Sequence, residues 1–273
     1  MTSTVRRAGR GEPVVLLHPL ALSGAVWGDF ATRLVASGFD VIAPDARGHG
    51  VEPAPWDGAP FSVADLADDV ATLLDDLGVD RAHVVGMSMG GSIAVELAAR
   101  HPGRVDRLVL ADTTAWYGPD APAAWTERAA RAVGVPRRRQ IPFQTDRWFT
   151  DEFVRTGHDE VRRVAAVFTA TDSLAHAAAC RALGALDARE RLASITAPTL
   201  VLTGEEDLAT PPSMGRALAD GIPGGRFELL PALRHLSLVE RPALAALVAA
   251  HLRAAAAPSL SDVECGCTAG VST

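Results

Sequence analysis

The strand–turn–helix junction around Ser88 constrains this chain more than any other stretch. A short β-branched run at residues 83–85 leads into Gly-Met-Ser-Met-Gly at residues 86–90, and a small, apolar, helix-compatible segment follows at residues 91–99. Glycines at both ends of Gly-x-Ser-x-Gly allow a strained turn and a close approach of strand and helix. A Gly-rich turn with an incidental serine is the alternative, but the flanking strand and helix favour a serine presented for nucleophilic chemistry.

Apolar runs of strand length alternate with helical patterns along most of the chain. The runs lie at residues 14–17, 39–43, 83–85, 105–111, 199–203 and 226–230. Continuous apolar runs are typical of parallel strands that are covered on both faces. The alternation therefore predicts an α/β protein with a mostly parallel central sheet and helices on both faces.

The alternation stops between residues 113 and 197. This block has helical patterns that contain Trp, Phe and Arg and are interrupted by prolines. Because it follows a strand, we expect it at the carboxyl end of the sheet, where open α/β sheets bind their ligands, and we interpret it as a lid. We therefore predict a core formed by residues 1–112 and 198–256, with the lid at residues 113–197 inserted between its two parts. Residues 257–273 are expected to form a disordered tail.

Composition excludes several classes of function. A formal net charge of −7 does not suggest nucleic-acid binding, and all 26 basic residues are arginine, which excludes a lysine Schiff base. Three cysteines do not make a disulfide framework, so we expect a cytoplasmic protein. The arginines before the run at residues 14–17 imitate a signal peptide, but His18 and the following proline end that run. We expect no membrane partner, because no stretch is long enough to span a membrane, and no nucleotide partner, because no Gly-x-Gly-x-x-Gly follows a predicted strand. We also expect no metal, because Cys265 and Cys267 alone are weak evidence for a metal site.

A serine nucleophile needs a base and an acid that orients the base, because an alcohol is hardly ionised at neutral pH. For this kind of junction the order along the chain is Ser, Asp, His. Asp207 lies in an acidic loop directly after a predicted strand, and His235, one of eight histidines, lies between the last strand and the terminal helix. The predicted catalytic residues are therefore Ser88, Asp207 and His235, with Asp112 at the preceding strand end as the rival acid.

Two backbone N–H groups are expected to form an oxyanion hole. Met89 follows the serine and begins a helix, where N–H groups point toward an anion. The second donor belongs in the loop after the first core strand, which reads His18-Pro19-Leu20. Pro19 has no N–H group, so Leu20 is the expected second donor.

The Ser88 junction, the Asp207 and His235 loops and the inserted lid together resemble the α/β-hydrolase family over about residues 5–254. A finer resemblance is to the 3-oxoadipate enol-lactonases of the β-ketoadipate pathway for aromatic catabolism. The segments that carry it lie at residues 45–50, 86–91, 147–150, 168–172, 180–183 and 207–211. The lid segments discriminate best, because other hydrolases share the core motifs. The sequence departs from these lactonases at residues 18–20, where it has His-Pro-Leu in place of a segment that resembles Asn-Ser-Leu in the lactonases.

The resemblance implies a serine hydrolase that opens a small carboxylated lactone, 3-oxoadipate enol-lactone, through an acyl-enzyme and without a cofactor. The free carboxylate of this substrate requires a cation. Arg147, beside Trp148 in the lid, is expected to bind it, and the arginines at 137–139 are alternatives if they do not form a solvated face. Other readings stay open: a carboxylesterase, a perhydrolase, a carbon–carbon-bond hydrolase, or a non-enzymatic receptor on this fold. No oligomeric state is indicated.

Overall fold

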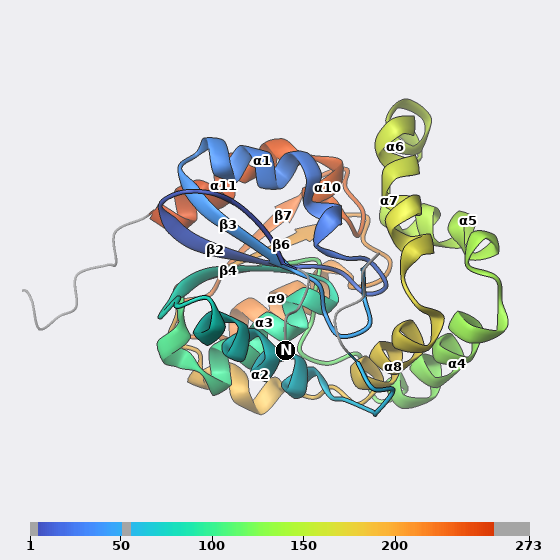
Figure 1. The fold of residues 1–273 in the computed structure, drawn as a ribbon, viewed down its shortest axis with the longest axis horizontal. Coiled ribbons are helices and arrows are strands. Elements are labelled where there is room, and N and C mark those ends of the chain that lie inside the picture. The colour runs from blue at the N-terminus through green and yellow to red at the C-terminus, as the bar shows by residue number, and fades with distance from the viewer. Residues whose placement is uncertain (1–4, 51–55, 254–273) are drawn as a thin grey trace, which may run out of the picture.

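The computed structural model describes residues 5–50 and 56–253, and its centre is a seven-stranded sheet (Figure 1). The strand order is β1-β3-β2-β4-β5-β6-β7, and every pairing is parallel except that of β1 with β3. This topology confirms the predicted α/β class with a mostly parallel sheet. The strands are β1 (Val5–Gly9), β2 (Glu12–Leu17), β3 (Phe39–Pro44), β4 (Ala82–Met87), β5 (Val105–Ala111), β6 (Thr199–Gly204) and β7 (Arg226–Leu230).

Helices cover both faces of the sheet, which explains why inner strands such as β4 and β6 are buried along their whole length. Figure 1 shows α1, α10 and α11 on one face and α2, α3 and α9 on the other. These helices are α1 (Gly28–Ala36), α2 (Val63–Asp76), α3 (Met89–Arg100), α9 (Pro212–Gly221), α10 (Ser237–Glu240) and α11 (Ala245–Arg253). Short 3-10 turns are η1 (Gly24–Trp27), η2 (Pro102–Arg104), η3 (Arg189–Ser194) and η4 (Pro242–Leu244).

The inserted block between β5 and β6 consists of helices, and in Figure 1 it stands to the right of the sheet. Helix α4 packs along α8, and α7 contacts η1 of the core. Arg163 of α7 donates hydrogen bonds to the carbonyl oxygens of Ala25 and Val26, which ties the lid to the core. The lid helices are α4 (Ala121–Gly134), α5 (Arg137–Trp148), α6 (Asp151–Thr156), α7 (His158–Ala170) and α8 (Ser173–Gly184).

The edge strand β1 is a feature that the sequence analysis does not predict. It pairs antiparallel with β3, and its two arginines form ion pairs with Asp40 and Asp45. Arg6 lies 2.8 Å from Asp45 and Arg7 lies 2.6 Å from Asp40, measured between the paired nitrogen and oxygen atoms. A charged, half-exposed edge strand has no apolar run that would reveal it.

Two searches of the described residues, for membrane-crossing helices and for clusters of metal-binding side chains, give negative results. None of its helices is long and apolar enough to cross a membrane. No three His, Cys, Asp or Glu side chains within residues 5–50 and 56–253 are grouped so that they could hold a metal ion. The predicted tail at residues 257–273, with Cys265 and Cys267, lies outside the described residues.

Candidate active site

Ser88 lies on a strained turn between β4 and α3. Its backbone dihedrals are φ 56° and ψ −121°, a region that residues with a side chain rarely adopt. A Cβ atom added at Gly86 would lie 2.3 Å from the carbonyl oxygen of Gly90, and one added at Gly90 would lie 2.0 Å from that of Leu17. Glycine at both positions is therefore what lets β2, β4 and α3 meet closely enough to form this turn.

Ser88, His235 and Asp207 form one continuous hydrogen-bonded chain, although they lie far apart in the sequence. Nε2 of His235 is 2.8 Å from Oγ of Ser88, and Nδ1 of His235 is 2.8 Å from Oδ2 of Asp207. An ionised Asp207 requires a proton on Nδ1, so Nε2 is left free to accept the serine proton. All three side chains are buried. This is the geometry of a nucleophile, a general base and an acid that orients the base.

The carboxylate of Asp207 is held ionised and fixed in place by its own loop. Oδ1 accepts hydrogen bonds from the backbone N–H groups of Ala209 and Thr210, at 2.7 and 3.0 Å, and Oδ2 accepts one from the Thr210 hydroxyl at 2.8 Å. Burial opposes ionisation, but the charge and hydrogen bond of His235 and the hydrogen bonds from Thr210 hold the pKa of Asp207 below its usual value.

Asp112, the rival acid, is also at the site but makes different contacts. Its Oδ1 accepts a hydrogen bond from the N–H of Gly204, and its Oδ2 accepts two from Ser237, one from the N–H and one from the hydroxyl. Burial and the nearby charge of Asp207 raise the pKa of Asp112 to about 7. Asp112 therefore ties the end of β6 to the beginning of α10, and the structure shows no hydrogen bond between its carboxylate and the His235 imidazole.

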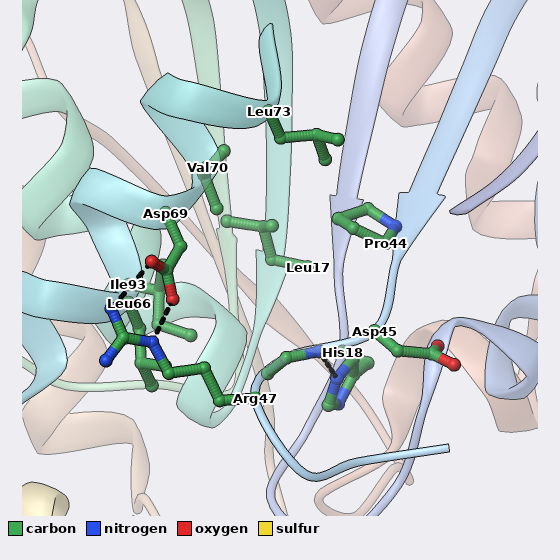
Figure 2. A pocket seen from close by; sticks show the side chains of 11 residues that line it. Leu17, His18, Pro44, Asp45, Arg47, Leu66, Asp69, Val70, Leu73 and Ile93 are labelled. Atoms are coloured by element: carbon green, nitrogen blue, oxygen red, sulfur yellow. Dashed lines mark hydrogen bonds and ion pairs between the residues drawn. The ribbon is translucent and has the colours of Figure 1, made fainter. Parts of the chain in front are cut away.

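The loop that carries Leu20 is anchored by His18. Figure 2 shows His18 close to Asp45, and the backbone N–H of Ala46 donates a hydrogen bond to Nε2 of His18 at 3.0 Å. Nδ1 lies 2.8 Å from the carbonyl oxygen of Pro19, so it carries the proton and donates there. Burial lowers the pKa of His18 to about 4, which keeps the ring neutral in this role. As the first residue of α3, Met89 has an N–H without a partner inside the helix, as an oxyanion donor requires.

A small cavity of about 30 Å³ adjoins the Ser88 hydroxyl and has room for one or two water molecules. Its lining combines the Leu20 loop and the catalytic chain with aromatic residues of the lid. The lining residues are Pro19, Leu20, Ser88, Tyr117, Trp125, Arg128, Trp148, Ala209, Thr210 and His235. Of the predicted substrate contacts, the structure thus places Trp148 at the cavity.

Arg147 is not among the residues that line this cavity. Its guanidinium donates a hydrogen bond to the carbonyl oxygen of Leu208 at 3.2 Å and lies 5.5 Å from the ring centre of Phe143. Arg137, one of the alternatives, is bound to the carbonyl oxygen of Phe168 and to His176. The neighbouring arginines at 138 and 139 are exposed.

The cavity is also lined by a positively charged side chain, Arg128, that the sequence analysis does not consider. Arg128 of α4 lies one turn after Trp125, and its guanidinium is 4.8 Å from the centre of the Trp125 ring. The signal that was available is periodicity: Ala121, Trp125 and Ala132 mark the buried face of a predicted helix, and Arg128 falls on that face.

Comparison with known proteins agrees with this geometry. Residues 12–242 match the model of a protein family that is described as the alpha/beta hydrolase fold. A putative carbamate hydrolase of Variovorax paradoxus is 34% identical over 86% of this chain and 88% of its own length. The 3-oxoadipate enol-lactonase 2 of Acinetobacter baylyi is 33% identical over 74% of each chain. The crystal structure of the enol-lactonase from Burkholderia xenovorans is 33% identical, with a TM-score of 0.85 over 91% of this chain and 95% of its own.

The family match covers most of the described residues, including the segments after β4, β6 and β7 that carry Ser88, Asp207 and His235. These relatives differ in the reactions for which they are named: one is named for carbamate hydrolysis and two are named enol-lactonases. The chain belongs to the α/β-hydrolase family.

Proposed function

We propose that this hydrolase acts through an acyl-enzyme formed on Ser88. The observation that carries the proposal is the chain Ser88–His235–Asp207, with 2.8 Å at each of its two links. His235 takes the serine proton as Ser88 attacks a carbonyl carbon, and Asp207 stabilises the resulting imidazolium. The N–H groups of Leu20 and Met89 stabilise the oxyanion. Water then releases the acyl group, with His235 again acting as base.

The proposed substrate is a small carboxylated enol-lactone of the 3-oxoadipate enol-lactone type. Relatives named 3-oxoadipate enol-lactonase support it, at 33% and 29% identity over 74% and 84% of this chain. The chemistry also suits the site: opening the ring expels an enolate, which is a better leaving group than an alkoxide, so His235 needs to give little acid assistance. The released enol converts to the ketone without further catalysis.

Carbamate hydrolysis is a second candidate, favoured by the relative from Variovorax paradoxus at 34% identity. It would use the same nucleophile, base and oxyanion donors, because a carbamate is also attacked at its carbonyl carbon. The two candidates differ in the leaving group and in the charge of the substrate, so substrate assays separate them.

The test is to measure turnover of 3-oxoadipate enol-lactone, a small carbamate and p-nitrophenyl acetate by the parent protein. Loss of enol-lactone absorbance with a kcat/KM on the order of 10⁴ M⁻¹s⁻¹ or higher is expected, in the range typical of enzymes on their substrates. Faster ammonia release from the carbamate would overturn the lactone proposal in favour of the second candidate. Labelling of Ser88 by a fluorophosphonate without turnover of any of the three compounds would instead support a receptor.

A further inference from the structure

Arg128 lines the cavity beside the reacting groups and has no anionic partner among the described residues. It lines the same cavity as Ser88 and His235, and its Nε atom is buried without a hydrogen-bond acceptor. Within residues 5–50 and 56–253, the structure shows no ion pair for Arg128. Its guanidinium instead stacks on the ring of Trp125. Arg128 is half-buried, and a guanidinium nitrogen buried without an acceptor is uncommon, because removing a polar N–H group from water without a hydrogen bond is costly.

The groups around Arg128 do not supply the missing negative charge. Cys180 and Tyr117 act on it electrostatically, but burial raises the pKa of the Cys180 thiol to about 11 and that of Tyr117 to about 12, so both are neutral at pH 7. The other charges that act on it, Arg131 and Arg147, are cations. The lid thus presents an uncompensated positive charge to the cavity.

The rival lid cations are already bound to protein acceptors. Arg137 donates to a carbonyl oxygen and to an imidazole, and Arg147 donates to the carbonyl oxygen of Leu208. Arg163 is paired with Glu160 and bound to two core carbonyls. Arg128 differs from all three in lining the cavity and in lacking an acceptor.

We propose that Arg128 is the specificity-determining residue that binds the free carboxylate of the substrate while Ser88 attacks its lactone carbonyl; this inference rests on the proposed function. A carboxylate can accept two parallel hydrogen bonds from a guanidinium, which would satisfy the buried donor and neutralise the charge. In 3-oxoadipate enol-lactone the carboxylate is attached through one CH₂ group to the ring carbon next to the ring oxygen. It therefore lies on the leaving-group side of the lactone carbonyl.

The experiment compares two lactones that share one ring. The first is 3-oxoadipate enol-lactone, and the second carries a methyl group in place of its carboxymethyl group and is uncharged. Arg128→Met keeps most of the side-chain volume and removes the charge. We expect it to lower the ratio of kcat/KM for the charged lactone to that for the neutral lactone by roughly 10- to 100-fold. An unchanged ratio would overturn the proposal.

Arg131→Met is the matched control. Arg131 lies on the same helix, three residues further on, and its guanidinium lies over the Phe143 ring at 5.3 Å rather than at the cavity. The same substitution there should leave the ratio unchanged, and an equal fall in both variants would assign the effect to the general charge of the lid. If Arg128→Met does not fold, Arg128→Lys carries the test: loss of the bidentate geometry should lower the ratio by roughly 3- to 10-fold, and no change overturns the proposal.

A second readout separates this inference from the proposed function. Glutarate, a small dicarboxylate, should slow fluorophosphonate labelling of Ser88 in the parent and in Arg131→Met, but not in Arg128→Met. That pattern in a protein that hydrolyses neither lactone would refute the proposed substrate and retain the anion site. Equal protection of the parent and Arg128→Met would refute the anion site, whichever substrate the parent turns over.

Discussion

Replacing Asp207 by Asn tests which acid orients His235, and the structure determines how the amide must lie. Oδ1 of Asp207 accepts hydrogen bonds from two backbone N–H groups, those of Ala209 and Thr210. An Asn side chain must therefore keep its oxygen at this position and turn its NH₂ group toward Nδ1 of His235. Nδ1 then has to accept, the proton moves to Nε2, and the imidazole can no longer take the proton of Ser88.

The expected loss in kcat for Asp207→Asn is on the order of 10⁴-fold, or about 5.5 kcal/mol at 1.36 kcal/mol for each factor of ten. Asp112→Asn should behave differently, because Asp112 accepts hydrogen bonds from Gly204 and Ser237 rather than from the imidazole. Its NH₂ group would leave one buried N–H without an acceptor, which costs about 1–3 kcal/mol of stability. We expect a fall of less than about 10-fold in kcat for this variant.

The assay is hydrolysis of p-nitrophenyl acetate and of the enol-lactone by both variants, with thermal unfolding measured in parallel. Asp207→Asn should unfold within a few degrees of the parent while losing its activity, and Asp112→Asn should show the reverse. A loss near 10⁴-fold in Asp112→Asn, with an active Asp207→Asn, would refute the assignment of the acid and the tautomer argument together.

Three further substitutions test other parts of the account. Burial lowers the pKa of His18 from 6.5 to about 4, so the unfolded chain binds the extra proton and stability falls as the pH drops from 6.5 toward 4. Titrations of unfolding should show that His18→Gln removes about one proton, or about 1.4 kcal/mol per pH unit, from that slope; an unchanged slope contradicts the neutral anchor. Gly90→Ala would bring a Cβ within 2.0 Å of the Leu17 carbonyl oxygen, and calorimetry should give a Tm roughly 10 °C lower, whereas a parent-like Tm contradicts the close approach. Arg147→Ala should lower kcat/KM for charged and neutral lactones equally, because its guanidinium contacts Leu208 and not the cavity; a selective loss of roughly 10-fold or more on the charged lactone would return the carboxylate to Arg147.

Elements with a local signature could be predicted from the sequence. The capping box at Ser62 and Asp65, which begins α2, is a pattern of four consecutive residues, and the covered parallel strands are continuous apolar runs. The same holds for the turn at Ser88, where the glycines and the flanking apolar segments stand next to one another in the chain. Each of these features is decided by neighbours within a few residues.

Features decided by distant neighbours could not be predicted in this way. The strand β1 pairs its arginines with Asp40 of β3 and with Asp45 just after it, and the sequence does not mark that pairing. Arg128 and Arg147 are both lid arginines next to aromatic residues, and the packing of α4 along α8 decides which of them reaches the cavity. Periodicity could identify the buried face of α4, but not the part of the core that this face meets.

The central claim is that Ser88 is the nucleophile, and turnover by Ser88→Ala tests it most directly. Alanine removes only the hydroxyl, so the variant should keep the unfolding transition of the parent. Its kcat on p-nitrophenyl acetate and on the enol-lactone should fall on the order of 10⁴-fold or more, because members of a catalytic triad act as a unit. A folded Ser88→Ala protein that retains its activity would contradict the acyl-enzyme account.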